Sequence, residues 1–300
     1  MPDHPPALQE QQVRARRRAI ACVLGSSGAF ALAAALVKHA SPGLPVAEVV
    51  LFRSLCSVLI LLPMARAHGG WAALHTKRPG AHLLRLVAGF SGMYASFYGY
   101  ANLPLATVTA LGFSMPIFLA ILSIPLLRER ISPVRAGAVV VGLLGVLIVL
   151  RPWEAGHDAA HTGPALVVIV GVAAWALAMI SIRRMGQGGE RNVTIVLLFS
   201  IGSTVLAALL CIPVWVTPTP MQLLALVGVG VISTGAQLLM TEGYRSGEAT
   251  MLAPFEYGAI LYAVLLGWLI WGEVPGSWEF TGIAVLILSG LYVWWREGRG

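Results

Sequence analysis

The sequence predicts an all-α polytopic membrane protein with ten transmembrane helices, arranged as two inverted five-helix repeats around a central cavity. Three observations predict this fold: the composition, the number of long apolar segments, and a weak internal repeat. Of the 300 residues, 57% are hydrophobic and 11% are charged, whereas an ordinary globular domain has about 25% charged residues. The mean hydropathy of +0.80 excludes a soluble enzyme, a disordered chain and a small disulfide-bonded framework.

Ten segments are long and apolar enough to span a bilayer, because a helix needs about 20 mostly apolar residues to cross about 30 Å of hydrocarbon. In chain order the expected spans are residues 19–37, 46–64, 82–100, 106–126, 134–150, 163–182, 193–214, 221–241, 249–271 and 279–295. Turn-forming residues such as Ser41-Pro42-Gly43 and Pro275-Gly276 separate them. Most connections are short, so consecutive helices are expected to be antiparallel neighbours.

The distribution of lysine and arginine predicts the orientation in the membrane. With the N-terminus inside, 16 of the 20 basic residues fall on the inner side, two (Lys38 and Arg151) fall on the outer side, and Arg53 and Arg85 fall within helices. By the positive-inside rule both termini are expected in the cytoplasm. The net charge of +7 is therefore attributed to topology and to contact with membrane lipid, and no nucleic-acid partner is expected.

An internal repeat divides the chain into two halves. Lys38 and Arg183 lie 145 residues apart, and Glu129 and Glu273 lie 144 apart. Each half contains five spans, an odd number, so the second half enters the membrane from the opposite side and the repeats are inverted. Inverted repeats can adopt two oppositely facing conformations, as alternating access requires. The expected parts are a basic cytoplasmic tail (1–18), a first repeat (19–150), an outer linker (151–162), a second repeat (163–296) and a cytoplasmic end (297–300).

Three groups of residues resemble motifs of a known family. They are Leu51-Phe52-Arg53; Met115-Pro116-Ile117-Phe118 followed by Arg128-Glu129-Arg130; and Ala253-Pro254-Phe255-Glu256-Tyr257 leading into Trp271-Gly272-Glu273. On these motifs the chain after its tail resembles the drug/metabolite transporter superfamily, ten-helix EamA type, with an amino-acid exporter as the nearest comparison in architecture. The resemblance implies a secondary carrier in a bacterial-type cell inner membrane, with a central cavity built from both repeats. Two residues depart from the pattern: Arg128 stands where the family often has glycine, and Ile260 takes the place that matches Pro116.

Two charged residues are expected deep in the membrane, where a charge costs about 2.5–3.5 kcal/mol unless it is paired or hydrated. Arg53 and Glu256 each lie about seven residues from a helix end, which is roughly 10 Å at 1.5 Å per residue. Arg53 could bind a substrate carboxylate, and Glu256 could bind an amine or a proton. The alternative is a structural ion pair, or an arginine that bonds to carbonyl groups and fixes helix positions. Glu48 and Glu242 are expected near helix ends, where charge costs little.

The uncharged candidates are side chains whose polar atoms need partners inside hydrocarbon. Tyrosine and tryptophan side chains in the middle of a helix point either to a cavity or to another helix, and a glutamine there forms hydrogen bonds between helices. Prolines interrupt two of the helices and can act as hinges. The expected substrate-binding residues are Arg53, Tyr94, Tyr98, Trp175, Gln237, Glu256 and Tyr257, and the expected hinges are Pro116 and Pro254.

The sequence contains no phosphate-binding glycine loop, no metal-binding motif and no nucleophile elbow. We therefore expect no cofactor, no metal and no enzyme activity. The first hypothesis is a secondary active or facilitative transporter that exports small metabolites, amino acids with neutral or aromatic side chains among them, by alternating access. Glu256 is its candidate proton carrier. An uptake carrier for S-adenosylmethionine or a nucleotide derivative is the alternative, which several basic residues in the cavity would favour; an intramembrane enzyme or assembly protein is a third.

Overall fold

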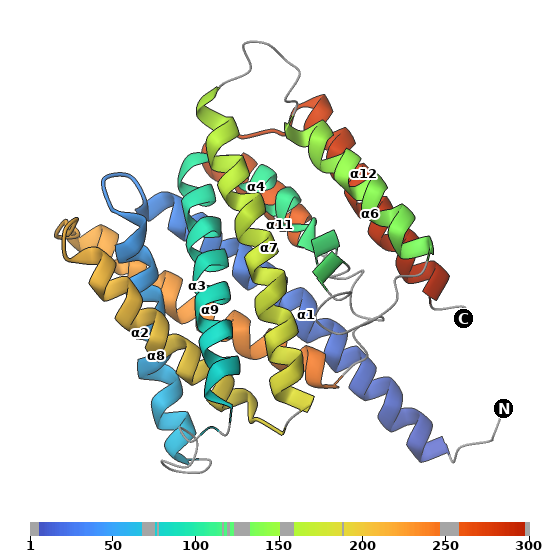
Figure 1. Cartoon of the computed structure of the whole chain (residues 1–300), viewed down its shortest axis with the longest axis horizontal. Coiled ribbons are helices and arrows are strands. Elements are labelled where there is room, and N and C mark those ends of the chain that lie inside the picture. Colours follow the sequence, from blue (N-terminus) through green and yellow to red (C-terminus); the bar gives the residue numbers. More distant parts are fainter. Residues whose placement is uncertain are drawn as a thin grey trace.

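The computed structural model describes residues 6–67, 76, 78–115, 117–118, 121–122, 133–150, 159–187, 189–246 and 258–297. All regular structure in these ranges is helical, which confirms the predicted fold class. The helices are α1 (Pro6–Ala40), α2 (Val46–Ala67), α3 (Pro79–Asn102), α4 (Leu105–Gly112), α6 (Pro133–Leu150), α7 (Ala159–Gln187), α8 (Asn192–Cys211), α9 (Pro220–Ser246), α11 (Gly258–Trp271) and α12 (Ser277–Glu297) (Figure 1).

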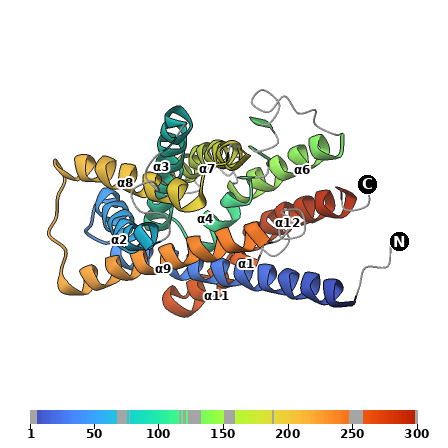
Figure 2. The same ribbon diagram turned by 90° about the horizontal axis from the view of Figure 1, so that it is seen from below.

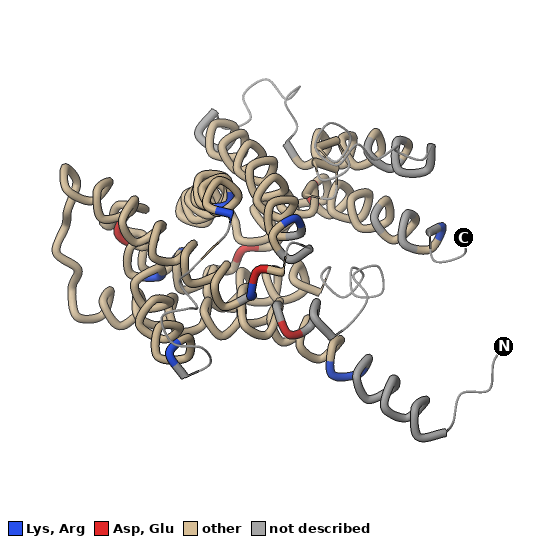
Figure 3. The backbone as a smooth tube through the Cα atoms, turned by 60° about the horizontal axis from the view of Figure 1, so that its bottom comes forward, with Lys and Arg blue, Asp and Glu red and all other residues tan. Residues whose placement is uncertain are grey.

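Five of these helices are long and apolar enough to cross a membrane: α1, α2, α7, α8 and α9. Shorter apolar stretches occur in α6, α11 and α12. In a helix the backbone N–H and C=O groups bond to each other. This is needed in a membrane, because hydrocarbon offers these groups no hydrogen-bonding partner. Few charged residues interrupt the described helices (Figure 3), so those inside the bundle need an explanation.

Two helices, α1 and α4, differ most from their predicted limits. α1 begins at Pro6, so residues 6–18 of the predicted tail continue the first span as helix. The described part of the expected span 106–126 is interrupted, because α4 ends at Gly112 and the amides of Phe113 and Ser114 bond three residues back, each at 3.0 Å. This break precedes Pro116, which has no amide hydrogen to bond back into the preceding helical turn. Pro116 itself lies outside the described residues.

The helices pack in a symmetrical pattern. α1 packs against α9, α3 against α7, α2 against α8, α4 against α11, and α6 against α12. The five helices of the first repeat correspond in chain order to α7, α8, α9, α11 and α12 of the second. Exchanging the two sets converts the α1–α9 pair into α7–α3 and returns each of the other three pairs to itself. The two halves are therefore related by an approximate two-fold axis.

The direction of the paired helices shows that the repeats are inverted. Gly142 of α6 lies against Ser289 of α12, and Gly145 lies against Leu286, so these two helices run antiparallel. A helix pair that a two-fold axis exchanges can be antiparallel only if the axis is perpendicular to the helices, which places it in the membrane plane. α6 and α12 lie side by side at one edge of the bundle (Figures 1 and 2). The predicted inverted-repeat arrangement is thus confirmed.

Close packing of α6 on α12 depends on Gly282. A Cβ atom there would lie 2.8 Å from the carbonyl oxygen of Gly145, a backbone atom that cannot turn aside. We expect Gly282→Ala to destabilise the protein by about 1–3 kcal/mol and to lower its Tm in detergent. Gly137→Ala on α6 is the control, because nothing lies within 4 Å of a Cβ at Gly137; alanine there should leave the Tm unchanged or raise it. Equal Tm values for the two variants would contradict this packing.

Candidate functional site

Arg53 of α2 is buried in the interior of the bundle, with 6% of its surface exposed. Its Nη2 donates a hydrogen bond of 3.2 Å to Oε1 of Gln237 on α9. Its Nη1 is buried without a hydrogen-bond partner. The structure thus brings together Arg53 and Gln237, which the sequence analysis proposed separately and which belong to different repeats. Nη1 of Arg53 remains available for a ligand.

A small cavity borders Arg53. The hydroxyls of Ser57 on α2 and Thr234 on α9 lie 2.7 Å apart and line this cavity together with Arg53, Gln237 and Ser200 of α8. Its volume is about 10 Å³, which holds about one water molecule. A metabolite can therefore reach Arg53 only when the helices around the cavity move apart.

Arg85 of α3 is a second buried arginine, with 2% of its surface exposed. Its Cζ lies 3.9 Å from the ring centre of Phe199 on α8 and 5.2 Å from that of Trp175 on α7. Its Nε and Nη1 have no hydrogen-bond partner. The prediction that Arg53 and Glu256 are the only deep charges is therefore wrong.

Gly89 explains why Arg85 is buried. Long helical side chains lean toward the N-terminus of their helix, and an arginine near a helix end ordinarily extends to the membrane surface. The guanidinium of Arg85 instead lies over Gly89, one turn deeper, where a Cβ atom would collide with Nη1. The spacing of Arg85 and Gly89, four residues apart, was the one sequence signal of this arrangement.

Half-buried aromatic side chains surround Phe199. Tyr94 and Trp175 belong to one cluster around Phe199 and Met93, and the ring of Tyr94 lies 6.1 Å from that of Phe90. Phe199 directly precedes Ser200, which lines the Arg53 cavity, so α8 contributes one residue to the aromatic cluster and the next to the cavity. Tyr98 is half-buried on the same helix as Tyr94 but is not part of this cluster.

Four other predicted residues, Glu256, Tyr257, Pro116 and Pro254, lie outside the described part of the chain.

Glu48 and Glu242 were both expected near helix ends. Glu48 is the third residue of α2, but it is fully buried, and its Oε1 accepts a hydrogen bond of 2.6 Å from the amide of Val216. The burial of Glu48 was not predicted. It is tolerated because the helix dipole favours a carboxylate in the first turn of a helix. Glu242 instead forms a partly exposed ion pair with Arg18, at 3.0 Å.

A network around Lys38 and Glu273 ties the two repeats together at one end of the bundle. The Nζ of Lys38, near the end of α1, donates to Oε1 of Glu273 and, at 3.1 Å, to the carbonyl oxygen of Leu103. Oε2 of Glu273 accepts a 3.4 Å hydrogen bond from the amide of Leu105. The Nζ also lies 5.2 Å from the ring centre of Trp271. We call these contacts the Lys38–Glu273 network; it joins α1 and the α3–α4 turn to the segment between α11 and α12.

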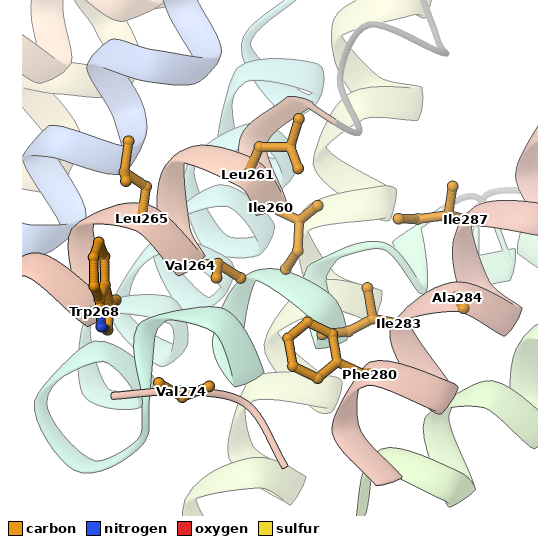
Figure 4. Close-up of a pocket in the computed structure, with 10 residues that line it drawn as sticks. All are labelled: Ile260, Leu261, Val264, Leu265, Trp268, Val274, Phe280, Ile283, Ala284 and Ile287. Carbon is orange, nitrogen blue, oxygen red and sulfur yellow. The ribbon is translucent and has the colours of Figure 1, made fainter. Parts of the chain in front are cut away.

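A larger cavity of about 570 Å³ lies between α11 and α12, lined by side chains such as Ile260, Val264, Phe280 and Ile283 (Figure 4). Its lining is apolar, and Trp268 contributes its one indole N–H. Leu261 and Trp268 at its border are exposed on the outside of the bundle. This groove suits hydrocarbon and lacks groups that would bind a polar metabolite.

Comparisons with known proteins agree with the fold and indicate transport. A crystal structure of a protein matches with a TM-score of 0.66 and 18% identity, over 93% of this chain and 96% of the other, which shows the shared fold. A riboflavin transporter of Vibrio cholerae is 29% identical over 88% of this chain and 89% of its own. An S-adenosylmethionine uptake transporter of Rickettsia prowazekii is 27% identical (84% of each chain), and a pseudopaline exporter of Pseudomonas aeruginosa is 29% identical (88% and 91%).

These relatives are transporters rather than enzymes, and their names differ in both substrate and direction. The family model matches twice, at residues 17–151 and 162–295, once in each half of the chain. The family resemblance that the motifs predicted is confirmed, and with its apolar helices the chain is a multi-pass membrane protein that belongs to the EamA-like transporter family.

Proposed function

We propose that this protein is a secondary carrier that moves a small organic solute with a carboxylate group by alternating access between its two repeats. The observation that carries the proposal is Arg53: a buried guanidinium with an unpartnered Nη1, held between a helix of each repeat through Gln237. A buried arginine binds a carboxylate with strong, charge-assisted hydrogen bonds. Because the cavity at Arg53 is closed in this conformation, the solute enters and leaves through relative movement of the repeats.

Amino acids, including neutral and aromatic ones, are the first substrate class of this proposal, and export is its direction. The aromatic cluster with Tyr94 and Trp175 supports it, because it packs around Phe199 of α8, the helix that also contributes Ser200 to the Arg53 cavity, and such surfaces accept apolar side chains. The proposed membrane is the bacterial inner membrane, with both termini in the cytoplasm, as the distribution of basic residues favours.

The remaining predicted residues have roles in this proposal. Glu256 carries a proton or binds the amine of the solute, and Tyr98 and Tyr257 contact the solute. Pro116 and Pro254 act as hinges. The helix break at residues 113–114 supports a hinge beside Pro116.

Uptake of a larger metabolite, such as S-adenosylmethionine or a nucleotide derivative, is the second candidate function. Arg85 favours it, since it adds a second buried basic residue to the interior. The names of two relatives, which state S-adenosylmethionine uptake and riboflavin transport, favour it as well.

Counterflow in proteoliposomes of known protein orientation tests both candidates. Vesicles are loaded with one unlabelled solute and placed in a dilute solution of the same solute in labelled form. The solutes tested are amino acids, S-adenosylmethionine and nucleotides. Loaded vesicles without the protein are the control. A carrier is expected to accumulate the label transiently above its equilibrium level for at least one solute. Absence of accumulation across the panel would contradict the proposed function.

A further inference from the structure

We infer that Arg85 is a second anion-binding group of the transport site, so that the preferred solute has two anionic groups, as a dicarboxylate has. This inference rests on the proposed function and narrows its substrate class. It assigns one anionic group of the solute to Arg53 and the other to Arg85.

The first step is the charge of the interior. Neither Arg53 nor Arg85 forms an ion pair with an acidic side chain in the part of the chain that the structure describes. Three of their nitrogen atoms, Nη1 of Arg53 and Nε and Nη1 of Arg85, are buried without an acceptor. Burial of an unpaired charge is strongly unfavourable. A bound anion would supply both the missing charge and the missing acceptors.

The second step is the geometry around Arg85. The rings of Phe199 and Trp175 contact the guanidinium, and Gly89 leaves the space that it occupies. Aromatic rings attract a cation but do not replace the in-plane acceptors that N–H groups need. The unpartnered Nε and Nη1 can each donate a charge-assisted hydrogen bond to an oxygen atom of a bound anion.

The third step is the proximity of the two arginines. They lie on adjacent helices, α2 and α3, and both reach α8: Arg85 contacts Phe199, and Arg53 shares its cavity with Ser200. Their positive charges repel each other. A solute with one negative charge neutralises only half of this site, whereas a solute with two anionic groups satisfies both arginines.

Paired ligands that differ in one acidic group test the inference in the purified full-length protein. The probes are glutamate against glutamine and aspartate against asparagine, with thermal stabilisation in detergent as the readout. In at least one pair the more acidic member is expected to bind about tenfold or more tightly than its partner. Arg85→Met should abolish that preference, and Arg85→Lys, which keeps the charge, should retain part of it.

The Tm without ligand separates an anion site from a packing role. Methionine removes an unpaired buried charge and keeps much of the volume, so Arg85→Met is expected to be at least as stable as the wild type when no ligand is bound. A lower Tm without ligand, together with an equal loss of binding for both members of each pair, would show that Arg85 only packs against Phe199 and Trp175, and would overturn the inference.

Two further outcomes would also overturn it. One is a wild type that prefers no acidic probe over its partner. The other is a preference for acidic probes that appears only in Glu256→Gln, because Glu256 would then be the internal counter-ion. Counterflow of neutral solutes without any charge preference would leave the proposed function standing and remove this inference. Stabilisation that depends on the charge of the probe, without counterflow of any solute, would contradict the proposed function and leave Arg85 as an anion-binding group.

Discussion

Replacing Arg53 with methionine is expected to lower the kcat/KM of transport by about 10- to 100-fold. A hydrogen bond to a charged group contributes about 1.5–3 kcal/mol, and each 1.4 kcal/mol corresponds to a factor of ten. The only side chain to which Arg53 donates in the described chain is Gln237, so the fold should survive the change. Initial rates of counterflow at several solute concentrations measure the effect.

Two control variants make this result specific. Arg53→Lys keeps the charge and should retain more transport than Arg53→Met. Arg191→Met makes the same chemical change at an exposed residue before α8 and should leave the rate unchanged. If Arg53→Met transports as fast as Arg191→Met, Arg53 has no part in binding the solute.

The sequence identified Arg53 and Gln237 as candidates because a charge and an amide in the middle of an apolar span each require a reason. It could not show that they contact each other. They are 184 residues apart, and the register between α2 and α9 depends on the packing of many side chains. The same limit applies to Arg85, whose partners Phe199 and Trp175 belong to the other repeat.

The helices themselves were easier to predict, since a 20-residue apolar segment has few other conformations in a membrane. α2, α3 and α9 begin within a few residues of the expected limits. The exceptions have local causes. The break after Gly112 precedes a proline, and α1 extends to Pro6 through a polar segment that hydropathy does not mark as a span.

Breaking the Lys38–Glu273 network is expected to open one end of the bundle, the end at which α1 finishes and α3 turns into α4. Both side chains are largely shielded, with 15% and 27% of the side chain exposed, and the network also includes backbone groups of Leu103 and Leu105. A partly buried pair of this kind contributes more than a surface ion pair, about 1 kcal/mol or more. Glu273→Gln should therefore increase the population of the open conformation about fivefold.

Pulsed EPR distances across this end measure the change. Spin labels at His39→Cys and Ser277→Cys, both exposed positions on different repeats, are placed in a variant without the native Cys22, Cys56 and Cys211. In Glu273→Gln the fraction of longer distances should rise. Exchange of the two charges, Lys38→Glu with Glu273→Lys, should reverse only part of that rise, because the ion pair is restored while the carbonyl of Leu103 and the amide of Leu105 lose their partners.

Glu242→Gln is the matched control for Glu273→Gln, because Glu242 pairs with Arg18 and so joins α9 to the opposite end of α1. If the repeats rock against each other, contacts at the two ends stabilise opposite conformations, and loss of the Arg18 pair cannot favour opening at His39 and Ser277. The long-distance fraction should then stay the same or fall in Glu242→Gln while it rises in Glu273→Gln. An equal rise in both variants would mean that the bundle loosens as a whole, and the Lys38–Glu273 network would then be a general packing contact rather than one that holds a single end closed.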